Sequence, residues 1–139
     1  MILFVVPGKP HGKARPRMTK SGHTYTPKNT VDYEKQVQVC YITEHKGVKL
    51  EGAITAYITA IYGVPKSASK ATRAAMLEGC IRPTKKPDVD NIAKAILDSL
   101  NGLAYDDDSQ VVRLSIDKAY GIEPCVMVAL NELKGDEGK

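Results

Sequence analysis

The sequence predicts an α/β (α+β) fold, a single small domain in which helices flank a mixed β-sheet. The chain has 139 residues, which suffices for one domain with a hydrophobic core and is short for two. Hydrophobic residues make up 42% and charged residues 26%, as is typical of a globular rather than a disordered chain. Apolar periodicity predicts the order strand, helix, strand, helix, helix, strand, strand, which favours a mixed sheet.

The first element is predicted to be a short buried strand over residues 2–6, all of which are apolar. Glycine, proline and basic residues over 7–22 indicate a loop or a loose hairpin. Within it, residues 18–19 are able to pair with residues 23–25, because the glycine between them tolerates the positive φ of a tight turn.

A helix is expected to start near Pro27 with Thr26 as its cap, because proline suits the first helical position. It is expected to end by Gly47, and residues 53–62 then alternate in the manner of a strand. The apolar stripe of the helix consists of Tyr33, Val37 and Tyr41.

The second half of the chain carries two helices and two strands. The predicted elements are a short helix capped by Ser67 or Ser69 and ending at Gly79, a helix over 88–100, and strands over 111–120 and 125–130. A single domain is therefore expected to span residues 1–133, with a frayed polar tail over 134–139.

Several protein classes are disfavoured by what the sequence lacks. No apolar run approaches the roughly 20 residues of a membrane helix, and the apolar start follows no basic segment of the kind that opens a signal peptide. We therefore expect a cytoplasmic protein with no membrane partner. The cysteines and histidines match no zinc motif and no Ser-His-Asp arrangement, and are interpreted as packing or incidental residues. They are Cys40, Cys80, Cys125, His11, His23 and His45.

Basic residues are concentrated in two segments of the sequence. Residues 1–31 contain no acidic residue, and a second cluster at 82–86 lies directly before an acidic motif. A local excess of positive charge indicates a polyanionic partner such as DNA, although a solvated basic loop that binds nothing remains an alternative. The candidate DNA-binding residues are Lys9, Lys13, Arg15, Arg17, Lys20, Arg82, Lys85 and Lys86.

The acidic motif lies on the predicted helix over 88–100. The apolar stripe of this helix consists of Val89, Ala93, Ile96, Leu97 and Leu100. Asp90, Lys94 and Asp98 are spaced by four and lie along a neighbouring face. Residues two apart on a helix point nearly opposite ways, so Asp88 is able to cooperate with Asp90 only from the N-cap or from an incoming extended segment.

Three consecutive aspartates at 106–108 follow this helix across a short turn. We expect the returning chain to bring one or two of them close to Asp88 and Asp90. Unpartnered carboxylates repel one another, whereas Mg²⁺ or Mn²⁺ favours hard oxygen ligands with net negative charge. Such an ion orients a phosphate, activates water and stabilises the leaving oxygen. Lys94 would then face the scissile phosphate or the attacking water.

Structural interpretations of the same residues also fit the sequence. In this interpretation Asp88 is an N-cap and nothing more, and Asp90 has no role beyond complementing the helix dipole. Lys94 can simply pair with an aspartate one turn away. The aspartates at 106–108 can form nothing more than a turn.

The acidic motif resembles that of the RusA family of Holliday-junction resolvases, and most of all the members carried by phages and prophages. The matching runs are Pro87-Asp88-Val89-Asp90-Asn91, Lys94, Asp98-Ser99-Leu100-Asn101-Gly102 and Asp107-Asp108-Ser109-Gln110-Val111. Near the N-terminus the runs 8–10, 12–17 and 25–27 also match, so the resemblance spans residues 3–130.

The resemblance implies a RusA-like homodimeric endonuclease that uses Mg²⁺ and introduces paired nicks at four-way DNA junctions in recombination and repair. Mn²⁺ is expected to be able to substitute, because it favours the same oxygen ligands. The family's essential aspartates fall on Asp88, Asp90 and Asp108, and its essential lysine on Lys94. Asp107 matches the other half of an acidic pair and is expected to share in metal binding. Asp106 lies outside the core of the motif.

Two other functions remain open from the sequence. One is a junction-binding protein that does not cut DNA, although a degenerate copy is expected to have lost part of the Asp88, Asp90, Lys94 and Asp108 set. The other is a nuclease with broader preference for branched DNA, including flaps and forks.

Overall fold

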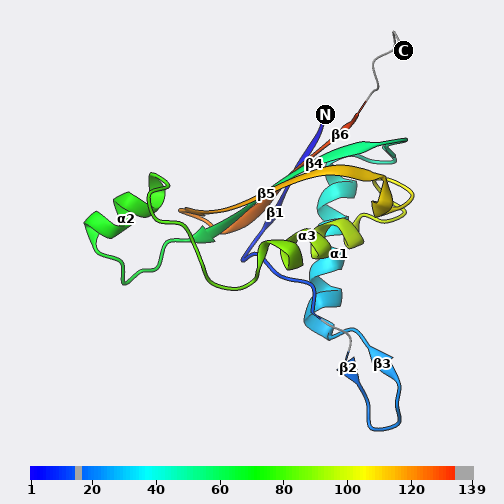
Figure 1. Cartoon of the computed structure of the whole chain (residues 1–139), viewed down its shortest axis with the longest axis horizontal. Helices are drawn as coiled ribbons and strands as arrows, with labels where there is room; N and C mark the ends of the chain where they lie inside the picture. Colours follow the sequence, from blue (N-terminus) through cyan, green and yellow to red (C-terminus); the bar gives the residue numbers. More distant parts are fainter. Residues whose placement is uncertain (15–16, 134–139) are drawn as a thin grey trace.

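A computed structural model describes residues 1–14 and 17–133 of the chain (Figure 1). In chain order the elements are β1 (Ile2–Pro7), β2 (Arg17–Met18), β3 (Thr24–Tyr25), α1 (Lys28–Glu44), β4 (Ile54–Gly63), α2 (Lys70–Leu77), α3 (Val89–Ser99), the 3-10 turn η1 (Asp108–Gln110), β5 (Val111–Gly121) and β6 (Cys125–Glu132). This order confirms the predicted succession of strands and helices. The tail predicted over 134–139 lies outside the described residues.

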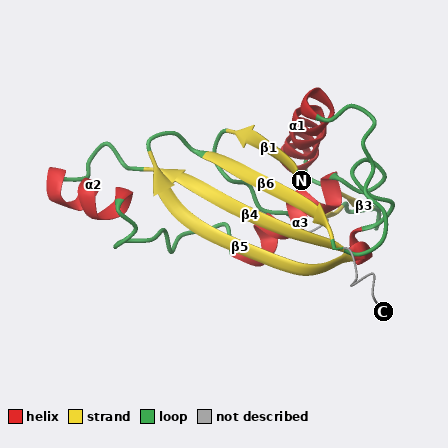
Figure 2. Ribbon diagram, turned by 90° about the horizontal axis from the view of Figure 1, so that it is seen from above, coloured by secondary structure: helices red, strands yellow, loops and turns green. Residues whose placement is uncertain are grey.

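A four-stranded mixed sheet forms the centre of the molecule, with the strand order β1-β6-β4-β5. Strand β4 pairs with β5 in parallel and with β6 antiparallel, and β6 also pairs antiparallel with β1. A parallel pair requires a long crossover between its strands. Here the crossover from β4 to β5 contains α2 and α3, which is how α3 comes to lie against the sheet (Figure 2).

Helices α1 and α3 cover one face of the sheet and share its hydrophobic core (Figure 1). The alternation of β1 follows this arrangement, because Phe4 is buried under the helices while Leu3 and Val5 are exposed on the uncovered face. The fully buried large side chains include Val37, Tyr41, Ile54, Ile58, Ile92, Ile96, Leu100 and Tyr105. Helix α3 is thus buried on one side, and its polar side faces outward.

Two details of the sequence prediction were wrong. Helix α1 has Pro27 rather than Thr26 at its N-cap, because Pro27 has an extended backbone (φ −54°, ψ 144°) and stands outside the helix. Val89 is 41% exposed because it occupies the first position of α3, and Ile92 and Ala95 are buried further along the helix. The core stripe of α3 is therefore broader than predicted and begins one turn later.

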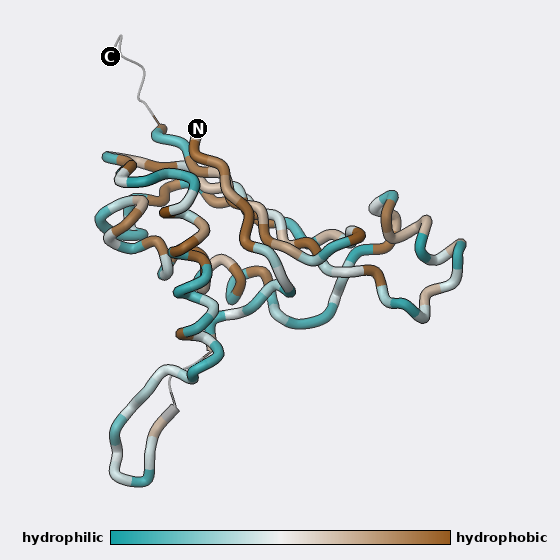
Figure 3. The backbone as a smooth tube through the Cα atoms, turned by 180° about the vertical axis from the view of Figure 1, so that it is seen from behind, coloured by the Kyte–Doolittle hydropathy of each residue, from teal (hydrophilic) through white to brown (hydrophobic). Residues whose placement is uncertain are grey.

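Two segments project from this core. The predicted hairpin is confirmed: β2 and β3 pair antiparallel, and the turn between them contains Gly22 at φ 87°. This hairpin extends away from the body and is largely hydrophilic (Figure 3). Helix α2, capped by the Ser69 side chain as predicted, has no buried residue and lies at another extremity (Figure 1). No helix in the described part of the chain is long and apolar enough to cross a membrane.

Candidate active site

The N-terminal end of α3 presents Asp88 and Asp90. Asp88 is the N-cap residue, with an extended backbone (φ −72°, ψ 156°), which is one of the two placements that the sequence left open. Its carboxylate makes no capping hydrogen bond, however, and both aspartates are exposed. A purely capping role for Asp88 is therefore not what the structure shows, and the two carboxylates remain available to a ligand.

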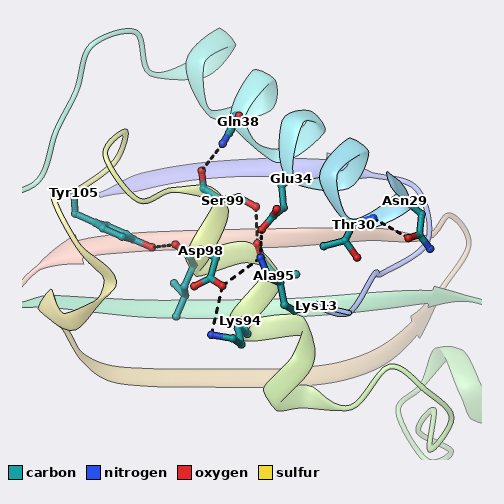
Figure 4. Close-up of polar contacts among 11 residues, drawn as sticks. Lys13, Asn29, Thr30, Glu34, Gln38, Lys94, Ala95, Asp98, Ser99 and Tyr105 are labelled. Atoms are coloured by element: carbon teal, nitrogen blue, oxygen red, sulfur yellow. Dashed lines mark hydrogen bonds and ion pairs between the residues drawn. The ribbon is translucent and has the colours of Figure 1, made fainter. Parts of the chain in front are cut away.

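Asp98 lies two turns beyond Asp90 on the same face of α3 and is the meeting point of two lysines. Its Oδ2 atom is 3.5 Å from the Nζ atom of Lys94 and 3.5 Å from that of Lys13 (Figure 4). Lys13 also forms a 2.7 Å ion pair with Glu34 of α1. Burial lowers the pKa of Lys13, but its hydrogen bonds and ion pairs with Glu34 and Asp98 outweigh this and raise the pKa overall.

The C-terminal end of α3 is held in place from two directions. Gln38 of α1 donates a 3.1 Å hydrogen bond to the carbonyl of Ser99. The fully buried Tyr105 donates a 2.6 Å hydrogen bond to the carbonyl of Leu97 (Figure 4). The first contact satisfies a carbonyl in the last turn of the helix, and the second adds to the backbone hydrogen bond that the Leu97 carbonyl already accepts from Leu100. Together they fix the segment that carries the next aspartates.

The three aspartates after α3 have three different environments. Asp106 is 84% exposed and forms a 2.7 Å ion pair with Lys49. Asp107 caps η1 by accepting a 3.0 Å hydrogen bond from the Ser109 backbone, and its hydrogen bonds with Ser109 lower the pKa of this carboxyl. Asp108 is half-buried, and its backbone donates a 2.8 Å hydrogen bond to Asn101. Only Asp108 interacts with an acid of α3.

Asp108 and Asp98 form a pair of carboxyl groups. The pKa of Asp108 is raised, first by burial, then by a hydrogen bond with Asp98 and by the negative charges of Asp107 and Asp98, while Lys94 partly offsets the shift. Raised pKa values in paired carboxyls are common at functional sites. Asp98 was not among the predicted site residues. Its spacing of four from Lys94 and eight from Asp90 was the available signal.

The acids thus form two groups at opposite ends of α3. Ten positions separate Asp88 from Asp98, which corresponds to about 15 Å along a helix axis. Within residues 1–14 and 17–133, no three His, Cys, Asp or Glu side chains lie close enough together to hold a metal ion. The expectation that one chain gathers Asp88 and Asp90 with residues 106–108 was therefore wrong, because Tyr105 and Asn101 tie the returning segment to the C-terminal end of the helix.

The predicted DNA-binding residues also divide by location. Lys13 is engaged with acids, as described above, and Arg82 donates a 3.0 Å hydrogen bond to the Lys118 carbonyl. Lys20 lies in the exposed turn of the β2–β3 hairpin, whereas a separate set surrounds a cavity next to Asp88: Lys9, Lys85 and Lys86. The predictions for Arg15 and for the side chain of Arg17 lie outside the described residues.

Comparison with known proteins identifies the family. The model of the endodeoxyribonuclease RusA family matches residues 7–131, nearly the whole chain. The chain belongs to the RusA family. It is also 37% identical over 138 residues to the uncharacterized protein YqaN of Bacillus subtilis (strain 168), covering 95% of this chain and 96% of that protein. The RusA match confirms the predicted family, and with it the class of enzyme, an endodeoxyribonuclease acting on Holliday junctions.

Proposed function

We propose that this RusA-family chain resolves Holliday junctions by paired Mg²⁺-dependent nicks, and that each active site is built from two copies of the chain. The observation that carries the proposal is the division of a complete motif between the two ends of α3: Asp88 and Asp90 at one end, Lys94 in the middle, and Asp108 at the other. All four motif residues are present, yet one chain does not bring the aspartates together.

The chemistry of these residues favours a hard divalent cation. The carboxylate of Asp88 makes no capping hydrogen bond, and Asp108 sits beside Asp98 at a cost in like-charge repulsion that a bound cation would relieve. A single described chain offers no group of three acids, so it does not by itself fit the ion. When bound at such a site, Mg²⁺ supplies Lewis-acid stabilisation and activation of water for phosphodiester hydrolysis.

A two-fold dimer resolves this difficulty. If the α3 helices of two protomers run antiparallel across the axis, Asp108 of one protomer lies beside Asp88 and Asp90 of its partner, and the reverse holds at the second site. C2 dimers are the commonest oligomers. Two equivalent sites also suit a four-way junction, because clean resolution requires one nick in each of two strands of like polarity.

Each residue then has a defined task. Asp88, Asp90 and Asp108 hold the ion, with Asp107 beside them, and Lys94 places a positive charge against the scissile phosphate or the attacking water. Lys94 is 62% exposed and only loosely paired with Asp98, at 3.5 Å, so it is accessible to a substrate. The exposed lysines neutralise DNA phosphates, which the aspartates alone would repel. Action on DNA agrees with the cytoplasmic location predicted from the sequence.

A subunit-mixing experiment tests the proposal. Chains carrying Asp88→Asn and chains carrying Asp108→Asn are co-expressed with different tags, and the heterodimer is assayed on synthetic junctions in Mg²⁺. Both homodimers are expected to be inactive. The heterodimer retains one site with all its aspartates and is expected to nick one strand, because its two substitutions fall together in the other site.

A heterodimer of Asp88→Asn with Asp90→Asn is the matched control. Both substitutions lie at the same end of α3, so both composite sites are broken and no nicking is expected. An inactive Asp88→Asn and Asp108→Asn heterodimer would contradict shared sites, and a monomer in sedimentation with and without junction DNA would contradict the dimer. Cleavage of flaps or forks as fast as junctions would favour the broader nuclease, and junction binding without cleavage by the wild type would favour the non-cleaving protein.

A further inference from the structure

A cavity of about 650 Å³ lies beside the N-terminal end of α3. This volume is within the range of small-molecule sites, about 300–1,000 Å³. Four of its lining residues are lysines, and none is acidic: Lys9, Lys66, Lys85 and Lys86. Such a concentration of positive charge without a counter-charge in its walls favours an anionic ligand.

The remaining wall of the cavity is largely apolar. Val64 and Pro65 come from the segment after β4, and Ile122 and Pro124 come from the turn between β5 and β6. Ile122 is 82% exposed although it is a large hydrophobic residue. A phosphate ion would use only the lysines and leave this wall without a partner. The lining therefore suits a ligand with both a phosphate and a flat, weakly polar body.

Side-chain contacts fix this cavity relative to Asp88. The hydroxyl of Tyr62 donates a 3.1 Å hydrogen bond to the carbonyl of Pro87, and both residues line the cavity. Lys118 donates a hydrogen bond to the carbonyl of Lys85, whose ammonium lies 5.6 Å from the centre of the Tyr62 ring. Asp88 is the next residue after Pro87, so a ligand in the cavity lies directly beside a proposed metal ligand.

We propose that the cavity holds one unstacked nucleotide of the cleaved DNA strand, next to the scissile phosphate. The lysines take the flanking phosphates, and the base lies against Val64, Pro65 and Ile122. Nucleotides at a branch point cost the least to unstack, because their pairing and stacking are already weakened. This inference rests on the proposed junction nuclease activity and extends it: the cavity selects where on the junction the strand is cut.

The first test uses free mononucleotides and the folded wild-type protein. Titration with the four deoxynucleoside 5′-monophosphates is expected to shift the amide signals of Val64 and Ile122 saturably in NMR spectra. Lys66→Ala is expected to weaken binding by about tenfold, the effect of one charge-assisted contact. Lys70→Ala removes an exposed lysine a few residues away, outside the cavity, and is expected to change nothing. Equal shifts with inorganic phosphate alone would overturn the nucleotide assignment.

The second test uses junctions with 2-aminopurine at each nucleotide flanking the branch point, in EDTA so that nothing is cut. Wild-type protein is expected to raise the fluorescence at one of these positions, and Ile122→Ser is expected to lose that rise. Val39→Ser, a change at a 61% exposed position of α1, serves as the matched control. The same fluorescence rise with Ile122→Ser as with wild type would overturn the inference.

The two proposals fail in different ways. Wild-type protein that cleaves junctions in Mg²⁺ but neither binds mononucleotides nor raises the 2-aminopurine signal would overturn the nucleotide site and leave the nuclease standing. Mononucleotide binding and a fluorescence rise without any cleavage would support the site and overturn the proposed activity.

Discussion

The two ends of α3 carry aspartates in opposite states. At the N-terminal end Asp88 and Asp90 are exposed, and Asp88 lacks a hydrogen bond to the helix that it caps. At the C-terminal end Asp98 is ion-paired with Lys13 and Lys94, and its partner Asp108 is half-buried with a raised pKa. Among the described residues, the acids at the N-terminal end make no side-chain ion pair, whereas those at the C-terminal end are held by lysines and hydrogen bonds.

This difference indicates how the site is assembled. A braced group of acids and lysines can hold its geometry without a ligand, since Gln38 and Tyr105 anchor the chain around it. Asp88 and Asp90 make no comparable contacts with the described residues, so a cation or a partner would supply them. An incomplete half-site at each end of one helix is what a composite dimer site requires.

The largest expected effect is on the rate of cleavage. Asp88→Asn, Asp90→Asn and Asp108→Asn should each reduce junction nicking by about a thousandfold, because removing a charged ligand costs several kcal/mol of transition-state stabilisation. Junction binding should remain equal or become tighter, since less negative charge faces the phosphates. Single-turnover cleavage and gel-shift titration measure the two quantities. Lys94→Ala should also lower the rate with little loss of binding.

Asp106→Asn is the internal control for this series. Its carboxylate is 84% exposed and turned to Lys49, so the variant should cut at close to the wild-type rate. Near-normal nicking by folded Asp88→Asn and Asp90→Asn proteins would remove the N-terminal end from the site. An essential Asp106 together with a dispensable Asp108 would shift the site along the acidic run.

The sequence could predict the fold because its signals are local. The i, i+4, i+8 spacing of Tyr33, Val37 and Tyr41 indicates a buried helical stripe, and all three are buried. The hairpin was likewise predictable from the glycine in its turn. The residue pattern along one helix does not indicate where the segment after that helix packs.

The arrangement of the site depends on contacts that are distant in sequence. Lys13 pairs with Glu34 and Asp98, far along the chain, and these contacts connect the N-terminal segment to α1 and α3. Tyr105 reads as an ordinary core residue, yet its hydrogen bond to Leu97 holds Asp108 at the C-terminal end of α3. The length of the helix alone separates Asp88 from that end by about 15 Å.

The next effect is on the salt dependence of DNA binding. Lys9 and Lys86 are exposed lysines at the N-terminal end of α3. Replacing both with alanine should reduce the slope of log affinity against log salt by about two units, close to one per lost phosphate contact. Lys13→Ala should leave the slope unchanged, because its ammonium is already engaged by Glu34 and Asp98. Fluorescence anisotropy at several salt concentrations measures the slopes of the wild type, the double variant and Lys13→Ala.

An unchanged slope for the double variant would move the DNA surface to the β2–β3 hairpin, where Lys20→Ala is the next test.

The smallest effect is on stability, and its sign depends on pH. Since the folded-state pKa of Asp108 is raised, the folded protein holds this proton more tightly than the unfolded chain does. Wild-type stability therefore falls as pH rises from the ordinary Asp pKa through the raised value, and the full penalty is present at neutral pH. Without metal, Asp108→Asn should raise the melting temperature at neutral pH, and should leave it unchanged once the pH is below the ordinary Asp pKa. Asp106→Asn should show no such gain at either pH.

Mg²⁺ should stabilise the wild type and not the Asp108→Asn protein, because the cation relieves the repulsion that the substitution has already removed. A variant that is less stable than the wild type at neutral pH would mean that the C-terminal end of α3 is held together by Asp108 rather than strained by it.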